Sequence, residues 1–251
     1  MFKEFSSLFS SKSAELADFE PSLFQLDQFW KFGELLLDWN ERMNLTAITE
    51  PKDVVVKHFL DSLISIPIIR DMEKNEKIMG SGKELMLADL GTGGGFPGIP
   101  LKIALSHLNI TLMDSLLKRL GFLQTVIKEL GLRKISTHHA RAEDAGHDPA
   151  FRQQFDIVTA RALADLPVLL EYTVPLLKVG GVLLAAKGKD PEEEISRSNR
   201  ALKELNCTVE RIHQYHLGEA AEYRSLIIVR KIGITSEKYP RKAGTPKKIP
   251  L

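Results

Sequence analysis

A glycine-rich segment, LADLGTGGGFPG (87–98), has the composition of a loop that holds a ligand against bare backbone. Five of its last eight residues are glycine, and Asp89 stands two residues before the first of them. Glycine reaches positive φ and lets the backbone approach a ligand closely. The apolar run before the loop is typical of a buried strand, and ligands bind beyond the carboxyl ends of such strands. Gly91, Gly93 and Gly95 are therefore predicted to bind a cofactor.

Two kinds of cofactor suit such a loop. Its G-x-G-x-x-G spacing fits the pyrophosphate of a dinucleotide, with Asp114 about twenty residues further on to bind a ribose. Asp89 argues against this, because a carboxylate beside the loop would repel a pyrophosphate. The same carboxylate would attract the ammonium and sulfonium groups of S-adenosylmethionine, which has no phosphate. We therefore favour S-adenosylmethionine, with Asp114 at its ribose and Ala142–Glu143 at its adenine. A nicotinamide-dependent oxidoreductase is the alternative.

The chain from residue 85 onward supplies the elements that would position this loop. Apolar runs alternate with helical patterns, which predicts a doubly wound α/β sheet of seven mostly parallel strands. The last two strands form a hairpin, so the final strand must run antiparallel to the others. The expected strands are 85–90, 109–114, 134–140, 155–160, 181–187, 207–217 and 223–232. The expected helices are 97–107, 115–130, 162–177 and 190–206.

Three parts are predicted along the chain. Apolar residues recur at helical spacing from Pro21 to Ile69, which predicts an N-terminal helical cap over 1–78. A cofactor-binding domain follows over 79–232. Residues 233–251 form a tail in which basic residues outnumber Glu237, the only acidic one. This tail also contains prolines and two glycines, so it is predicted to be a non-helical, flexible arm for a polyanion. A solvated tail that aids solubility is the alternative.

Composition excludes several classes of protein. Cys207 is the only cysteine, so the chain forms neither a disulfide framework nor a zinc–thiolate cluster. The histidines lack companions at ligand spacing, and no metal site is predicted. The apolar runs are far shorter than the roughly 18 residues of a membrane helix, and no secretory signal is seen at the N-terminus. These features predict a cytoplasmic protein that does not act on membranes.

Several segments together resemble one known family. They are DLGTGGGFPGIPLKIA, LMDSLLKRLGFL, RAED, ARALADL, AAKG, WNERMNLTAI, HFLDSL and YPRKAGTP. In this combination the chain, from about Phe24 to its C-terminus, resembles the bacterial GidB family. That resemblance implies a Rossmann-like class I methyltransferase domain and transfer of a methyl group from S-adenosylmethionine to guanine N7 in 16S ribosomal RNA. The implied partner is 16S ribosomal RNA or a small-subunit assembly intermediate, and the implied state is a monomer.

The resemblance also implies roles for particular residues. Gly91 and Phe96 would line the methionine and sulfonium end of the cofactor. Ser115 and Leu116 would join Asp114 at the ribose. Arg161 would lie at the mouth shared by cofactor and substrate.

The chain lacks the residues that methylation at other RNA atoms needs, which agrees with methylation at guanine N7. Methylation of cytosine C5 uses a cysteine nucleophile, and Cys207 lies far along the chain from the cofactor loops. Methylation of an exocyclic amine typically uses an Asp/Asn-Pro-Pro-aromatic turn, and ARALADLP stands at that place. Guanine N7 already has a free lone pair, so no general base is expected and no catalytic residue is assigned. Alternatives are a methyltransferase of small molecules or proteins and a non-catalytic ribosome-binding factor.

Basic residues are predicted to contact RNA phosphates. They are Arg161, Lys187, Lys238, Arg241, Lys242, Lys247 and Lys248. Lys187 is included because an unpaired lysine at the end of a buried strand needs a partner. Asn44, His58 and Asp61 are polar residues of the cap for which capping and core hydrogen bonds compete with substrate contact.

Overall fold

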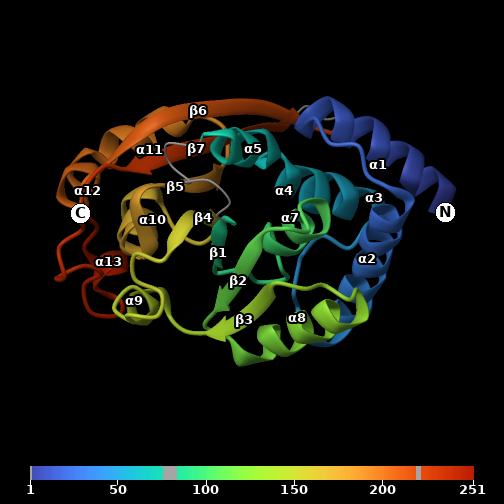
Figure 1. Cartoon of the computed structure of the whole chain (residues 1–251), viewed down its shortest axis with the longest axis horizontal. Coiled ribbons are helices and arrows are strands. Elements are labelled where there is room, and N and C mark those ends of the chain that lie inside the picture. Colours follow the sequence, from blue (N-terminus) through green and yellow to red (C-terminus); the bar gives the residue numbers. More distant parts are fainter. Residues whose placement is uncertain (1, 76–83, 219–221) are drawn as a thin grey trace. The chain divides into compact units, whose positions relative to one another are not determined.

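The computed structural model describes residues 2–75, 84–218 and 222–251. Its seven strands are hydrogen-bonded in the order β3-β2-β1-β4-β5-β7-β6 (Figure 1). They are β1 (Met86–Leu90), β2 (Asn109–Asp114), β3 (Ile135–His139), β4 (Phe155–Arg161), β5 (Leu177–Lys187), β6 (Cys207–Leu217) and β7 (Glu222–Lys231). β4 pairs in parallel with β1 and β5, whereas β7 is antiparallel to both β5 and β6. The predicted α/β sheet with an antiparallel last strand is confirmed.

Burial explains why these runs become strands. The first six residues of β4 are all buried, and so are the last four of β1. Strands covered on both faces need such continuous apolar runs, which the alternating pattern of a half-exposed strand cannot supply. The register places Asp89 opposite Thr159, so a polar pair lies within this apolar setting.

The chain divides into two compact units, and the first comprises Met1–Glu84, Thr92–Leu112 and Leu116–His138. Its helical elements are α1 (Phe2–Ala17), α2 (Leu23–Met43), α3 (Pro51–Val54), the π-helix η1 (Val55–Leu60), α4 (Asp61–Leu63), α5 (Ile66–Lys74), α7 (Gly98–Ala104) and α8 (Leu117–Glu129). Fully buried phenylalanines form its core; the ring centroids of Phe9 and Phe29 lie 4.5 Å apart, and those of Phe29 and Phe59 lie 5.4 Å apart. The predicted boundary between residues 78 and 79 lies outside the described residues.

Capping fixes both ends of α2. Ser22 and Gln25 form a reciprocal capping box at its start, which satisfies N–H groups that the helix cannot pair itself. Asn44 ends the helix in the left-handed conformation, and its N–H donates to the carbonyl of Asn40. Asn44 therefore has a capping role in the structure.

The second unit comprises Leu85–Gly91, Met113–Ser115 and His139–Leu251. Its helical elements are α9 (Ala142–Ala145), α10 (Leu166–Thr173), the 3-10 helix η2 (Val174–Leu176), α11 (Pro191–Arg197), α12 (Asn199–Glu204) and α13 (Thr245–Lys248). The predicted helix over 190–206 is thus two helices that meet at Ser198, whose hydroxyl donates to the carbonyl of Glu194. Such back-bonding by serine bends helices.

The C-terminal segment is packed within the second unit and includes α13, so the prediction of a flexible, non-helical arm is wrong. The Arg152 guanidinium donates to the carbonyls of Thr235, Ser236 and Tyr239. Tyr239 is 4% exposed, and the short helix α13 lies near α9 and α10 in Figure 1. The composition of the segment concealed this, because its anchors are single residues bonded to distant parts of the chain.

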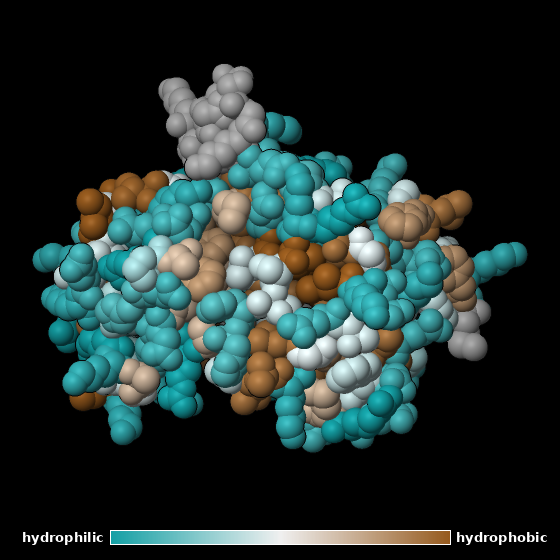
Figure 2. Space-filling view, turned by 60° about the horizontal axis from the view of Figure 1, so that its bottom comes forward, coloured by the Kyte–Doolittle hydropathy of each residue, from teal (hydrophilic) through white to brown (hydrophobic). Residues whose placement is uncertain are grey.

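Figure 2 shows one face of the molecule, on which hydrophilic side chains surround patches of hydrophobic ones. The exposed apolar residues include Leu116 and Leu117 at the start of α8, which are 51% and 67% exposed.

Candidate active site

β1 contains a buried carboxylate near its end and is followed by a glycine in the left-handed conformation. Asp89 is fully buried, and its Oδ1 accepts a hydrogen bond from the Thr159 hydroxyl at 3.3 Å. The N–H of Gly91 donates to the carbonyl of Met113 at 2.8 Å. Gly91 has a φ of +70°, and a Cβ there would lie 2.7 Å from Leu163 Cδ1. Asp89 is therefore held in place, and Gly91 needs to be glycine.

The neighbouring strand ends add two more carboxylates within the same unit. Asp114 ends β2 and is 3% exposed, and its carbonyl accepts from the N–H of Ala140. Glu143 lies in α9, just after β3, and is 9% exposed. Ser115 is exposed and its carbonyl bonds to His139 Nε2 at 3.0 Å. Buried carboxylates thus lie at or near the carboxyl ends of three neighbouring strands, β3, β2 and β1.

Glu143 is fixed by partners that sequence reasoning missed. Its Oε1 accepts from the N–H of Gly244 at 2.9 Å, so the C-terminal segment holds the carboxylate. Burial, together with the charge of Glu143 and a hydrogen bond to it, raises the pKa of Tyr172 to about 12. No local pattern marks these contacts, because Gly244 lies 101 residues from Glu143 in the chain.

The remainder of the glycine loop belongs to the first unit, where it forms a tight turn. The carbonyl of Thr92 accepts from the N–H groups of Gly95 and Phe96 at 2.9 and 3.0 Å. Gly93 and Gly95 have φ values of +57° and +94°. A Cβ at Gly95 would lie 2.7 Å from Ile99 Cγ1, so this glycine is required by packing as well as by φ.

Phe96 is packed within the aromatic core of the first unit. It is 5% exposed, and the His58 ring stacks on it at 4.4 Å with an interplanar angle of 16°. His58 Nε2 is hydrogen-bonded to the Thr46 hydroxyl at 2.7 Å. His58 thus contributes to packing around the glycine loop, and Asp61 is likewise buried, at 7% exposed, on the next turn.

The predicted cofactor residues are divided between the two units. The second unit contains Asp89, Gly91, Asp114, Ser115, Ala142, Glu143 and Arg161. The first unit contains Gly93, Gly95, Phe96 and Leu116.

Three of the predicted RNA-binding residues already hold ion pairs. Lys187 Nζ lies 2.6 Å from Glu194 Oε1 and donates to the carbonyl of Ala164, so the premise that this lysine lacks a partner is wrong. Arg241 pairs with the fully buried carboxylate of Glu171 at 2.6 Å. Lys238 pairs with Glu204 at 3.4 Å but stays 63% exposed.

Three tail lysines are exposed, namely Lys242, Lys247 and Lys248. Within the described residues, no group of three or more His, Cys, Asp or Glu side chains is arranged to hold a metal ion. None of the described helices is long and apolar enough to cross a membrane.

The donor set suits S-adenosylmethionine. Buried Asp89 and Asp114 carry the charge and the acceptors that an ammonium group and ribose hydroxyls need. Asp89, two residues before the first glycine of the loop, would repel the pyrophosphate of a dinucleotide. The strand order, the positive-φ glycines after β1 and these carboxylates define an S-adenosylmethionine-dependent methyltransferase.

Comparison with known proteins identifies the family. A family model described as rRNA small subunit methyltransferase G (GidB) matches residues 25–226, and the chain belongs to this family. A relative from Desulfitobacterium hafniense, named ribosomal RNA small subunit methyltransferase G, is 49% identical over the full length of both chains. A relative of the same name from Streptococcus sanguinis is 45% identical over 99% of each chain.

One solved structure shows the same fold at low identity. A structure from Galdieria sulphuraria, assigned as a sarcosine dimethylglycine methyltransferase, is 11% identical with a TM-score of 0.50, covering 73% of this chain and 88% of that one. M. jannaschii TYW2 in complex with AdoMet is 15% identical with a TM-score of 0.47, covering 65% and 76%.

Proposed function

We propose that this enzyme transfers a methyl group from S-adenosylmethionine to N7 of a guanine in 16S ribosomal RNA. The observation that carries the proposal is the buried carboxylate of Asp89 beside a positive-φ glycine loop, in a chain of the GidB family. Relatives that match almost the whole chain are named for methylation of small-subunit ribosomal RNA, which supports the same substrate here.

The proposal assigns each end of the cofactor to residues of this chain. Asp89 faces the ammonium and sulfonium groups, and the loop residues Gly91, Gly93, Gly95 and Phe96 border the methionine end. The ribose is assigned to Asp114, Ser115 and Leu116, the adenine to Ala142 and Glu143, and the mouth of the site to Arg161. When bound, S-adenosylmethionine supplies a methyl group on a positively charged sulfur.

No side chain has to remove a proton in this reaction. The lone pair of guanine N7 lies free in the ring plane, so it forms the new bond to the methyl carbon as the bond from carbon to sulfur breaks. The protein therefore contributes orientation, which brings the reacting atoms to the ~3–3.5 Å of a near-attack geometry. Methylation makes the guanine ring cationic, so a carboxylate or carbonyl near the ring would stabilise that charge.

RNA binding is assigned to exposed basic groups. Lys238 and the three tail lysines are exposed and lie on one ordered segment, so their charges reach phosphates without a folding cost. Three further basic residues would contact RNA while keeping the interactions that they already make within the protein, namely Arg161, Lys187 and Arg241. The proposed partner is 16S ribosomal RNA or a small-subunit assembly intermediate in the cytoplasm, with the protein acting as a monomer.

Calorimetry tests the cofactor half of this proposal, and tritium transfer tests the substrate half. The protein should bind S-adenosylhomocysteine and not NADH, and Asp89→Asn should weaken that binding. Asp190→Asn is the matched control, because that carboxylate is 82% exposed in the same unit and should leave binding unchanged. Label from tritiated S-adenosylmethionine should enter small-subunit RNA as 7-methylguanosine. Label in any other nucleoside would overturn the proposed target atom.

A further inference from the structure

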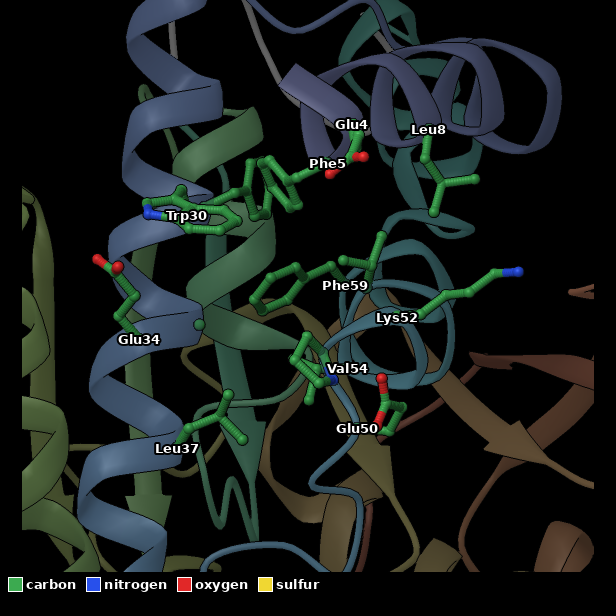
Figure 3. A pocket seen from close by; sticks show the side chains of 14 residues that line it. Glu4, Phe5, Leu8, Trp30, Glu34, Leu37, Glu50, Lys52, Val54 and Phe59 are labelled. Atoms are coloured by element: carbon green, nitrogen blue, oxygen red, sulfur yellow. The ribbon is translucent and has the colours of Figure 1, made fainter. Parts of the chain in front are cut away.

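A cavity of about 560 Å³ lies among the N-terminal helices of the first unit (Figure 3). Its walls come from α1, α2 and the segment 50–59, and we call it the cap cavity. None of the residues assigned to S-adenosylmethionine lines it. Its volume lies in the range of pockets that bind small organic molecules.

The walls of the cap cavity are aromatic and aliphatic. Figure 3 shows Phe5 on α1, Trp30 and Leu37 on α2 and Phe59 on η1 around one hollow. Phe59 is 1% exposed and belongs to the aromatic core, so this wall is fixed. Trp30 is half-buried and meets the Phe5 ring edge-on at 5.4 Å. The cavity thus offers a guest rigid aromatic surfaces.

Glycine at position 33 leaves room for a guest in the middle of α2. A Cβ there would meet the Phe59 ring at 3.6 Å, which is ordinary contact, so the backbone does not require glycine. Glycine inside a helix costs about 1 kcal/mol relative to alanine. A larger side chain at Gly33 would project toward the same hollow and fill part of it.

The charged side chains of the lining are mostly acidic. Glu4, Glu34 and Glu50 come from three separate segments, all three are exposed, and Figure 3 shows them around the apolar interior. Lys52 is the one basic residue among the described lining residues. The opening therefore carries a net negative charge, which attracts cations and repels anions such as phosphates.

We infer that the cap cavity binds a small organic cation, an ammonium or guanidinium group attached to an apolar body. The apolar body occupies the aromatic hollow, and the cation lies among the carboxylates at its opening. Aromatic faces add to this preference, because their negative π-faces attract organic cations. The negative opening disfavours the RNA backbone as the occupant, so the cavity is a site separate from the proposed substrate.

A matched set of three probes tests this inference on the full-length protein. Octylammonium, octanol and octanoate share one chain and differ in head-group charge. The sequence has two tryptophans, so Trp39→Phe leaves Trp30 as the reporter of cavity binding by fluorescence. We expect octylammonium to bind about tenfold or more tightly than octanoate at low salt, with octanol between them. Equal affinities for the ammonium and the carboxylate would overturn the inference.

Three variants locate the binding site. Glu34→Gln with Glu50→Gln should reduce the preference of octylammonium over octanoate by about threefold or more. Glu41→Gln is the control, because this exposed acid lies on α2 and does not line the cavity. Gly33→Leu should abolish the fluorescence response without lowering thermal stability, and it should leave the affinity for S-adenosylhomocysteine unchanged. A full response in Gly33→Leu, or the same loss in Glu41→Gln, would place the probes elsewhere and refute the assigned site.

Discussion

Arg241→Gln should destabilise the protein far more than a surface substitution does. The Glu171 carboxylate is fully buried, and the Arg241 guanidinium donates to both of its oxygens through Nε and Nη2. Removing the guanidinium leaves the buried carboxylate with a hydrogen bond from the backbone N–H of residue 241, at 2.7 Å. Breaking a buried pair on one side costs about 3–5 kcal/mol. Arg241 is 25% exposed, so water can reach the vacated position, and we expect about 3 kcal/mol.

Urea unfolding followed by far-ultraviolet circular dichroism measures this cost. Lys238→Gln is the control within the same segment, since its pair with Glu204 is solvent-exposed and should contribute less than about 1 kcal/mol. Adding Glu171→Gln to Arg241→Gln should recover about 2 kcal/mol, because the buried charge is then removed. A cost below about 1 kcal/mol for Arg241→Gln would refute the argument that this pair anchors the C-terminal segment.

Four further outcomes follow from the structure. Asp89→Asn should lower the affinity for S-adenosylhomocysteine about ten- to hundredfold, the loss of one charged hydrogen bond of ~1–3 kcal/mol, measured by calorimetry. Gly95→Ala should cost about 2 kcal/mol more in urea unfolding than Gly131→Ala, since both have positive φ but only Gly95 is crowded. Burial lowers the pKa of Lys231 from 10.5 to about 8, so the unfolded chain binds this proton more tightly than the folded chain does. The stability of the wild type relative to Lys231→Met should therefore rise by up to about 3 kcal/mol as the pH is raised from about 8 to 10.5. Glutamine at the three tail lysines should flatten the log–log salt dependence of RNA binding by roughly one unit per lost phosphate contact and leave cofactor affinity unchanged.

The sheet and the conformation of the glycine loop could be predicted because their signals are local. Continuous apolar runs mark β1 and β4 as strands covered on both faces, and the observed strands differ from the predicted ones by only a few residues. Gly91 and Gly95 have positive φ values, which only glycine adopts readily, so the glycine content of the segment is enough to predict a loop there.

The features that the sequence concealed depend on contacts between distant segments. Arg241 and Glu171 are 70 residues apart, so nothing in the tail reveals that its arginine meets a buried carboxylate. The sequence does not reveal the partner of Lys187, because Glu194 faces this lysine only once α11 has formed after β5. Helix α1 carries Phe5 and Phe9 one turn apart on its buried side. This is a helical spacing, but a single pair of residues is too short a pattern to predict a helix.

The most direct test of the proposed function is a map of 7-methylguanosine in 16S ribosomal RNA from cells with and without the gene. Borohydride reduction followed by aniline cleaves the chain at 7-methylguanosine, and primer extension locates the break. We predict a break at one guanine that is present with the gene, absent without it and restored when the gene is supplied again. The same breaks in both kinds of cell would contradict methylation of guanine N7 by this enzyme.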